Sequence, residues 1–346
     1  MRDVRAEPVR MALVGLGGHG RTIQTAAEEV SGIEVAAVYD VNDELTAEAA
    51  ERFGCTAAAS FEDLLGSDDL EAVALITPNA LHLEQASAAF DRGLHVFVEK
   101  PIANRLGDGL AIIRASERAG RRLMVGHNMR FGRAPERARQ FVREGRLGEV
   151  VTVELHFSAD NTRRMDPSTW RMNPSECPLL PVMQLGIHGI DLVHFFLAPI
   201  VEVHAFARSL TVPDGVVDSV SASMMLESGV TGTLVSNYCS QIHFEVRIAG
   251  TEASLRLTPH RLWFRANRDT DAHGEGPADE HDFRPFDRES YRRQLEVFAE
   301  AVAGEGALHP DGWDGLRALA VVDALERSAA SGAPVTVLVN VPEEAS

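Results

Sequence analysis

Short apolar segments alternate with helix-length segments through the first 128 residues, and this alternation constrains the fold more than any other feature of the chain. The apolar segments are almost uniformly hydrophobic, which is typical of strands covered on both faces. They are residues 9–14, 35–39, 72–76, 96–98 and 123–125. Strand, helix and strand repeated in this order predict an α/β domain with a doubly wound parallel sheet and right-handed crossovers.

The helix-length segments of this region are each closed by a glycine. They cover residues 22–30, 43–53, 81–92 and 108–119, and the glycines are Gly32, Gly54, Gly93 and Gly120. Glycine adopts the left-handed conformation at little cost, so these positions predict left-handed helix ends.

The pattern changes after residue 128. Residues 150–157 alternate in polarity like a strand with one wet face, and several further strand candidates follow a helix at 183–197. The later candidates are residues 201–209, 219–226, 231–238, 244–249 and 253–257. Short turns between them predict an α+β domain with a large open, mainly antiparallel sheet. We therefore expect two domains, 1–128 and 129–346.

Three other segments of the second region have distinct patterns. Helices are expected near residues 135–144, 291–303 and 312–330. Residues 267–289 are strongly acidic and indicate a solvated excursion. His273 and His281 lie in that excursion without a fixed ligand spacing, so no metal site is expected there.

Charge and cysteine content exclude several classes of protein. The 51 acidic and 33 basic residues give a formal net charge of −18, which argues against binding to nucleic acid. We find no apolar stretch near the roughly 20 residues that span a bilayer, and no signal peptide, so no membrane association is expected. Cys55, Cys177 and Cys239 are widely spaced, which supports neither disulfides nor a zinc ribbon. A cytoplasmic location is the default expectation.

A glycine-rich loop lies between the first strand and the first helix. Gly15, Gly17 and Gly20 satisfy the pattern GxGxxG, in which the glycines permit a tight turn, close approach of a pyrophosphate and close helix packing. The candidate cofactor contacts in this loop are Gly15, Leu16, Gly17, Gly18, His19 and Gly20. The context predicts a Rossmann-type dinucleotide site, and a purely structural turn is the alternative.

Asp40 ends the second strand 20 positions beyond Gly20, the spacing of a carboxylate that accepts the ribose hydroxyls. Its charge would repel a 2′-phosphate, and residues 41–44 supply no basic neighbour. NAD is therefore favoured over NADP as the cofactor. The alternative is that Asp40 is an ordinary residue of a strand-end turn.

Two further motifs resemble the Gfo/Idh/MocA family of NAD(P)-dependent oxidoreductases. Thr77-Pro78-Asn79-Ala80-Leu81-His82 follows the strand at 72–76, and Glu99-Lys100-Pro101 follows the strand at 96–98. The resemblance extends from about Val9 to Val339. It implies that Thr77, Pro78, Asn79 and His82 line the cofactor cleft, that Lys100 reaches the reacting carbon, and that Glu99 and Pro101 shape its turn. A structural bridge between Lys100 and an acid is the alternative.

The helix at 183–197 resembles the family's substrate-domain helix. Gln184, His188 and Asp191 match three polar positions of that family and form one stripe at 100° per residue. His194 is rotated by about 120° from His188, which argues against a pair of metal ligands. The resemblance assigns His188 as general base and Lys100 as the group that polarises the substrate oxygen, with Gln184 and Asp191 as substrate contacts. A buried, hydrogen-bonded histidine is the alternative.

This helix departs from the family pattern at two places. Gln184 stands where a carboxylate is common, so it cannot stabilise a charged histidine as an anion would. Residues 179–182 also replace a stretch that is commonly rich in glycine. Both differences leave the identity of the substrate open.

The loop before this helix carries candidate substrate contacts. Trp170 can stack on a sugar ring, and Arg163, Arg164 and Arg171 can bind an acidic group. Asn128 and Arg130 are further candidates by their family position. Arginines that merely solvate the loop are the alternative for Arg163 and Arg164.

The resemblance implies an oxidoreductase that transfers a hydride between NAD and a secondary hydroxyl of a sugar, polyol, inositol or sugar acid. Two alternatives remain open: a glycoside-cleaving enzyme that oxidises its substrate transiently, and a cofactor-binding sensor without catalysis. The family also implies a homodimer or homotetramer, formed through the exposed face of the second sheet.

Overall fold

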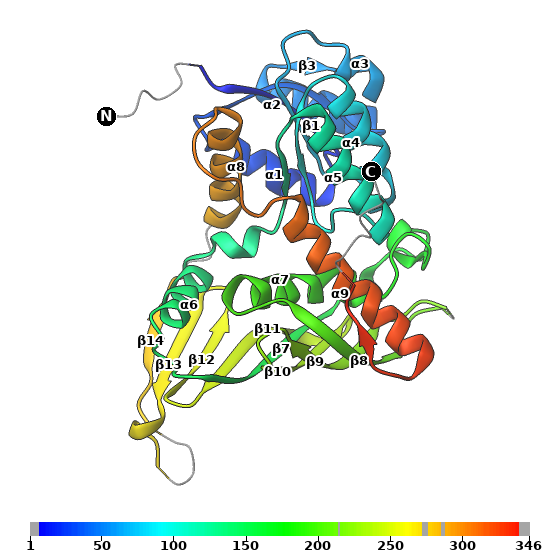
Figure 1. The fold of residues 1–346 in the computed structure, drawn as a ribbon. Coiled ribbons are helices and arrows are strands. Elements are labelled where there is room, and N and C mark those ends of the chain that lie inside the picture. The colour runs from blue at the N-terminus through cyan, green and yellow to red at the C-terminus, as the bar shows by residue number, and fades with distance from the viewer. Residues whose placement is uncertain (1–6, 214, 272–275, 285–287, 339–346) are drawn as a thin grey trace. The chain divides into compact units, whose positions relative to one another are not determined.

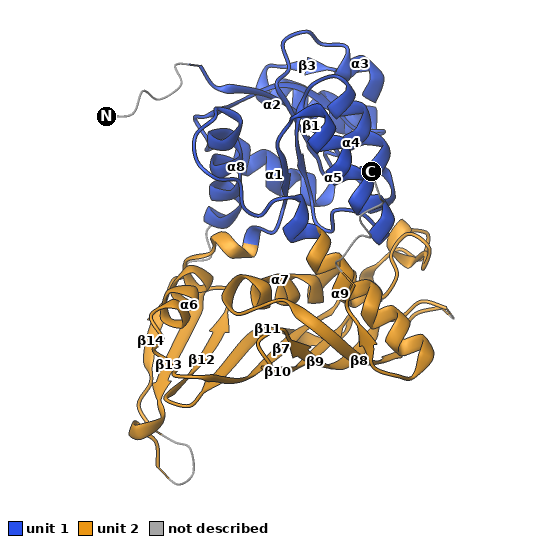
Figure 2. Ribbon diagram, in the orientation of Figure 1, with its two compact units in different colours: residues 1–128, 288–315 blue, residues 129–287, 316–346 orange. Residues whose placement is uncertain are grey.

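The computed structural model describes residues 7–213, 215–271, 276–284 and 288–338 (Figure 1). The chain divides into two compact units (Figure 2). The first unit comprises residues 1–128 and 288–315, and the second comprises residues 129–287 and 316–346. Residues 288–315 therefore belong to the first unit, although the sequence led us to expect them in the second domain, 129–346. The reason is a long-range contact, because α8 (Glu289–Val302) packs against α1 (Gly18–Glu28).

The first unit contains a six-stranded parallel sheet, as the apolar segments predicted. Its strands are β1 (Val9–Val14), β2 (Ile33–Tyr39), β3 (Thr56–Ala57), β4 (Ala72–Leu75), β5 (His95–Val98) and β6 (Leu123–Val125). Their order is β3-β2-β1-β4-β5-β6, which confirms a doubly wound sheet. The strand β4 is buried along its whole length. Helices therefore cover both faces of the sheet, as Figure 1 shows.

The helices of this unit follow the predicted segments closely. They are α1 (Gly18–Glu28), α2 (Asp43–Phe53), α3 (Phe61–Leu65), α4 (His82–Asp91), α5 (Leu106–Ala119) and α8, with a short 3₁₀ turn η1 (Asn79–Leu81) before α4. Gly54, Gly93 and Gly120 have positive φ angles of 62°, 74° and 62°, as predicted. The prediction for Gly32 was wrong, because α1 already ends at Glu29 in a right-handed conformation.

The second unit contains a nine-stranded sheet. Its strands are β7 (Val150–Asp160), β8 (Ile200–Arg208), β9 (Ser219–Leu226), β10 (Thr231–Asn237), β11 (Cys239–Gly250), β12 (Ala253–Thr258), β13 (Arg261–Ala266), β14 (Asp279–Asp282) and β15 (Val335–Thr336). Their order is β14-β13-β12-β11-β7-β10-β9-β8-β15. The pair β7–β10 is parallel and the other pairs are antiparallel, which confirms the predicted sheet type.

Three strands of this sheet escaped prediction. The edge strand β14 lies within residues 267–289, which we expected to be a solvated excursion throughout, and its sequence Asp-Glu-His-Asp is almost wholly charged. An edge strand pairs on one side alone and tolerates charge, so its sequence lacks the apolar signal of a buried strand. The strands β13 and β15 also have no predicted counterpart.

One face of the nine-stranded sheet is covered by helices. Val153, Leu155 and Phe157 of β7 are buried, whereas the intervening Glu154 and His156 are exposed. The helices α6 (Arg133–Arg143) and α7 (Ile187–Phe196) contact the sheet on its buried face (Figure 1). The helix α9 (Gly312–Ser331) completes the chain's long helices. No helix in the described ranges is both long and apolar enough to cross a membrane.

The segment predicted as one helix at 183–197 has two parts. Residues Val182–Gly186 form a π-helical turn, η5, and α7 follows it directly. At this turn the hydroxyl of Ser236 donates a hydrogen bond to the carbonyl of Pro181 over 2.9 Å. The rotation of 100° per residue therefore does not apply from Gln184 to His188, and the single stripe of Gln184, His188 and Asp191 stays a prediction.

Gly189 allows α7 to approach β7 closely. A Cβ atom at this position would lie 2.6 Å from Cε2 of Phe157, whose ring is fully buried. We expect Gly189→Ala to destabilise the chain by about 1–3 kcal/mol, because the helix or the ring must move. The midpoint of urea unfolding measures this change.

Gly107→Ala is the matched control, since a Cβ atom on Gly107 in α5 meets nothing within 4 Å. In a helix that substitution should be neutral or stabilising by about 0.5–1 kcal/mol. Equal unfolding midpoints for the two variants would contradict the packing role of Gly189.

Candidate active site

The glycine-rich loop is shaped by two close backbone approaches. A Cβ atom on Gly15, whose φ is 89°, would lie 2.6 Å from the carbonyl oxygen of Ile76. A Cβ atom on Gly20 would lie 2.1 Å from the carbonyl oxygen of Gly15. Gly17 is the N-cap of α1 and provides no side-chain acceptor for the helix. The loop and the helix N-terminus together fit the cradle that a pyrophosphate requires.

Asp40 lies directly beside this loop. One carboxylate oxygen accepts a hydrogen bond from the N–H of Leu16 over 2.7 Å, and the other accepts from the N–H of Asn42 over 2.9 Å. Each oxygen keeps a second lone pair that can accept from a ribose hydroxyl. The N–H of Asp40 donates to Thr46 Oγ1 over 2.9 Å, which fixes the end of β2. The loop and the carboxylate thus form one rigid group.

The segment from Thr77 to His82 packs against the same loop, but its residues differ in exposure. His82 is fully buried, and its ring nitrogens lie 3.1 Å from the carbonyl oxygens of Thr77 and Pro101. Burial lowers the pKa of His82, although these carbonyl groups act in the opposite direction. His82 therefore ties two turns together, and its predicted contact with a cofactor stays a prediction. Asn79 is also buried, and its amide nitrogen has no hydrogen-bond partner among the described residues.

Glu99 is a buried carboxylate next to Lys100. Its side chain is 5% exposed, and one oxygen accepts a hydrogen bond from the N–H of Lys100 over 3.1 Å. Burial alone would raise the pKa of Glu99, but the nearby His19 and Lys100 outweigh it and lower that pKa. Gly126 makes room for the carboxylate, because a Cβ atom there would lie 2.8 Å from Oε1. The Lys100–Pro101 peptide bond is cis.

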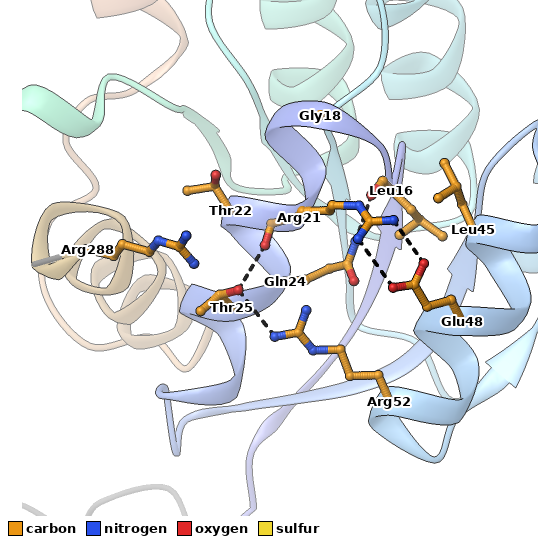
Figure 3. A pocket seen from close by; sticks show the side chains of 10 residues that line it. All are labelled: Leu16, Gly18, Arg21, Thr22, Gln24, Thr25, Leu45, Glu48, Arg52 and Arg288. Carbon is orange, nitrogen blue, oxygen red and sulfur yellow. Dashed lines mark hydrogen bonds and ion pairs between the residues drawn. The ribbon is translucent and has the colours of Figure 1, made fainter.

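A polar pocket of about 380 Å³ adjoins the glycine-rich loop (Figure 3). Arg21 donates to both carboxylate oxygens of Glu48, at 3.3 and 2.9 Å, and Arg52 donates to Thr25 and Glu28. These pairs balance most of the charge around the pocket. The lining residues are Leu16, Gly18, Arg21, Thr22, Gln24, Thr25, Leu45, Glu48, Arg52 and Arg288. The sequence offered no signal for this pocket, since it depends on how α1, α2 and residue 288 pack.

Asn128 also serves the first unit. Its amide nitrogen donates a hydrogen bond to Oγ of Ser290 over 3.2 Å, and its side chain bonds to Tyr291. Asn128 is buried, so it connects β6 to the start of α8. The side chain of Asn128, which we predicted as a substrate contact, therefore forms hydrogen bonds within the first unit.

In the second unit, two predicted substrate contacts bind each other. Nε and one terminal nitrogen of Arg130 donate to the two oxygens of Asp191 over 2.8 and 2.6 Å. The side chains of Arg130 and Asp191 are 7% and 1% exposed. This buried, bidentate pair ties the segment after β6 to α7. The pair supports the helix that carries His188, and the substrate contacts expected of Arg130 and Asp191 stay predictions.

In the loop before α7, some of the predicted substrate-binding side chains contact one another. Nε of Arg171 donates to the side-chain oxygen of Gln184 over 3.3 Å, and the guanidinium lies 4.4 Å from the ring centroid of Trp170. His188 is half-buried on α7. By contrast, Arg164 is exposed, and Arg163 is 70% exposed and paired with Asp160 at 3.1 Å. Arg163 and Arg164 thus match the alternative of a solvated loop.

The remaining histidines considered in the sequence have other surroundings. Nε2 of His194 accepts a hydrogen bond from the N–H of Ile200 over 3.2 Å, which closes the turn between α7 and β8. The ring of His281 packs against Phe141 and Phe283. His273 lies outside the described residues.

One described cluster, His309, Asp311 and Asp314, has a spacing that could hold a metal ion. The carboxylates already accept from backbone N–H groups at the start of α9, with Asp311 receiving from Asp314 over 2.9 Å and Asp314 from Asp311 over 3.1 Å. This reciprocal pattern is that of a helix cap and explains the cluster without an ion.

Comparisons with known proteins agree with this organisation. Residues 9–127 match the model of the oxidoreductase family with an NAD-binding Rossmann fold, and residues 136–256 match the Gfo/Idh/MocA C-terminal domain. The chain is 31% identical to D-xylose 1-dehydrogenase (NADP(+)) 2 of Haloferax volcanii, over 93% of this chain and 98% of that protein.

Two further relatives cover almost the whole chain. Inositol 2-dehydrogenase 1 of Saccharopolyspora erythraea is 29% identical, over 95% of this chain and 96% of that protein. The solved structure of an aldose-aldose oxidoreductase from Caulobacter crescentus, complexed with glycerol, is 26% identical with a TM-score of 0.85, over 95% of this chain and 99% of that one. The chain therefore belongs to the Gfo/Idh/MocA family of NAD(P)-dependent oxidoreductases.

Proposed function

We propose that this enzyme transfers a hydride between NAD and a secondary hydroxyl of a sugar, polyol, inositol or sugar acid. The observation that carries the proposal is the position of Lys100 at the carboxyl end of β5, in the unit that holds the glycine-rich loop and Asp40. Ligands of doubly wound sheets bind beyond the carboxyl ends of the strands. Two relatives, a D-xylose dehydrogenase and an inositol dehydrogenase, support the substrate class.

Oxidation of an alcohol removes a hydride from carbon and a proton from oxygen. Bound NAD supplies the hydride acceptor, and Asp40 with residues 15–20 would hold it. We assign His188 as the base that takes the hydroxyl proton, because imidazole exchanges protons near neutral pH. The Lys100 ammonium would donate a hydrogen bond to the same oxygen and stabilise its developing negative charge.

Trp170 and Arg171 are our candidates for recognition of the sugar. The two side chains stack, and Arg171 also holds Gln184. An indole presents an apolar face to the C–H groups of a sugar ring, and the guanidinium can donate to its hydroxyl or acidic groups. Gln184 would then set the orientation of Arg171.

We expect Lys100→Met and His188→Asn each to lower kcat/KM by at least about 100-fold, through loss of the polarising cation or of the base. Initial rates of NADH formation measure this effect, with the best substrate from a screen of inositols, aldoses, sugar acids and glycosides. Arg163→Ala, on an exposed side chain, is the control and should leave kcat/KM within about twofold. Full activity in either test variant would contradict our assignment of roles. Cleavage of a glycoside without net NADH would instead indicate the glycoside-cleaving alternative.

Asp40 favours NAD, because its carboxylate would repel a 2′-phosphate and none of residues 41–44 is basic. Asp40→Ser should lower the ratio of kcat/KM for NAD to that for NADP by about tenfold or more, since it removes the repulsion and a ribose acceptor. Steady-state rates with the two cofactors give the ratio. Asp43→Ser, in the first turn of α2, removes the same charge nearby and should leave the ratio almost unchanged. A wild-type preference for NADP would refute the role of Asp40.

We also propose that the enzyme forms a homodimer or homotetramer through the open face of the second sheet. Phe206 and Met225 on this face are 65% and 40% exposed. By strand register, Phe206 lies opposite Ser221, which lies opposite Val235, which lies opposite His156. This row of residues from Phe206 to His156 contains no Asp, Glu, Lys or Arg, and an exposed row of this kind is typical of a surface that associates with a copy of itself.

Phe206→Glu should shift the enzyme to a smaller species in light scattering, because it would bury a charge in the proposed interface. Val41→Glu places the same charge on an exposed residue of the first unit and should leave the assembly unchanged. A monomeric wild-type enzyme at micromolar concentration would rule out this interface.

A further inference from the structure

We propose that His19 is a positioning residue that joins the glycine-rich loop to the turn of Lys100 through the buried carboxylate of Glu99. This inference rests on the proposed function, because it concerns the dinucleotide and Lys100. His19 occupies a variable position of GxGxxG, so the pattern itself assigns it no role. Its role comes from three contacts within the first unit.

The first contact joins His19 to the buried carboxylate. Nε2 of His19 lies 3.1 Å from Oε1 of Glu99. The second oxygen of Glu99 accepts from the N–H of Lys100. The carboxylate thus has the loop on one side and the Lys100 backbone on the other. Since a buried carboxylate without polar partners is costly, the imidazole of His19 helps to keep Glu99 ionised and in place.

The second contact holds the imidazole ring. The rings of His19 and Tyr291 meet edge to face, with centroids 5.5 Å apart and planes at 63°. Burial raises the pKa of Tyr291 to about 12, and the charge of Glu99 acts in the same direction, so its hydroxyl stays neutral. Tyr291 is bonded to Asn128, which is also bonded to Ser290. The start of α8 therefore packs against the ring of His19.

The third observation is steric. Gly126 leaves the space that the Glu99 carboxylate fills, because a Cβ atom there would lie 2.8–3.0 Å from all three carboxylate atoms. Glu99 therefore has little freedom to turn away from His19. A shift of the glycine-rich loop on binding of a dinucleotide must then be transmitted to Glu99 and to the backbone of Lys100. Cofactor binding and the placement of Lys100 therefore depend on the same contact between His19 and Glu99.

The test measures binding of NADH by calorimetry in a double-mutant cycle. We expect His19→Ala to weaken NADH binding by about tenfold, the loss typical of one charged contact, and Glu99→Gln to have a similar effect. The double variant should bind about as weakly as either single variant, since both remove one interaction. His19→Gln retains a donor toward Glu99 and should restore most of the affinity. His309→Ala, on an exposed histidine of the same unit, is the control.

Kinetics separate positioning from loss of fold. His19→Ala should lower kcat as well as raise the KM for NAD, whereas His19→Gln should keep most of kcat and remain folded by circular dichroism.

NADH affinity within about twofold of wild type in both His19 variants, or additive effects in the cycle, overturns the inference. Wild-type enzyme that binds NADH but oxidises no sugar overturns the proposed function alone, and the binding cycle still decides on His19. Wild-type enzyme that binds no NADH overturns both.

Discussion

The approach of Gly20 to Gly15 is the constraint on which the cofactor unit depends. With 2.1 Å between a would-be Cβ atom and a carbonyl oxygen, no residue other than glycine allows α1 to begin where it does. That start fixes Leu16, whose N–H binds Asp40 and whose carbonyl accepts from Gln24 over 2.9 Å. Strand, loop, helix and the carboxylate of Asp40 are thus set by one close backbone contact.

Each unit supports its proposed catalytic side chain with a buried carboxylate that a nitrogen-bearing side chain contacts. In the first unit Glu99 lies between His19 and the backbone of Lys100. In the second unit two guanidinium nitrogens of Arg130 donate hydrogen bonds to Asp191. Asp191 lies three residues after His188 on α7. Buried charge pairs have narrow geometry and are costly to break, so they specify position more than they add stability. Lys100 and His188 are therefore placed by neighbours that do not themselves react.

The sequence predicted what depends on local pattern. The strands of the first sheet are uniformly apolar, and Gly15, Gly20, Asp40 and Lys100 stand at fixed places relative to them, so both the fold and the loop could be anticipated. The packing of α8 against α1 could not be anticipated, because no sequence pattern near residue 288 indicates a contact with a helix so distant in the chain. The edge strand β14 carries charge instead of an apolar pattern.

Side-chain roles were harder to predict than positions. His82, Arg130 and Asp191 match family positions and lie near the proposed site, yet their polar atoms are satisfied by buried protein groups. Hydrogen-bond partners of this kind come from distant segments, so residue type and spacing cannot distinguish a ligand contact from a support. The π-helical turn before α7 likewise involves a distant partner, because the carbonyl of Pro181 at its start accepts a hydrogen bond from Ser236 of β10.

The central claim is transfer of hydride from a substrate carbon to NAD. Its most direct measurement uses a sugar or polyol that carries deuterium on the carbon of the reacting hydroxyl, with mass spectrometry of the dinucleotide after turnover. We predict that the NADH formed contains one deuterium atom and that its formation is slower than with the unlabelled substrate. Product formed without deuterium in the dinucleotide would contradict this account.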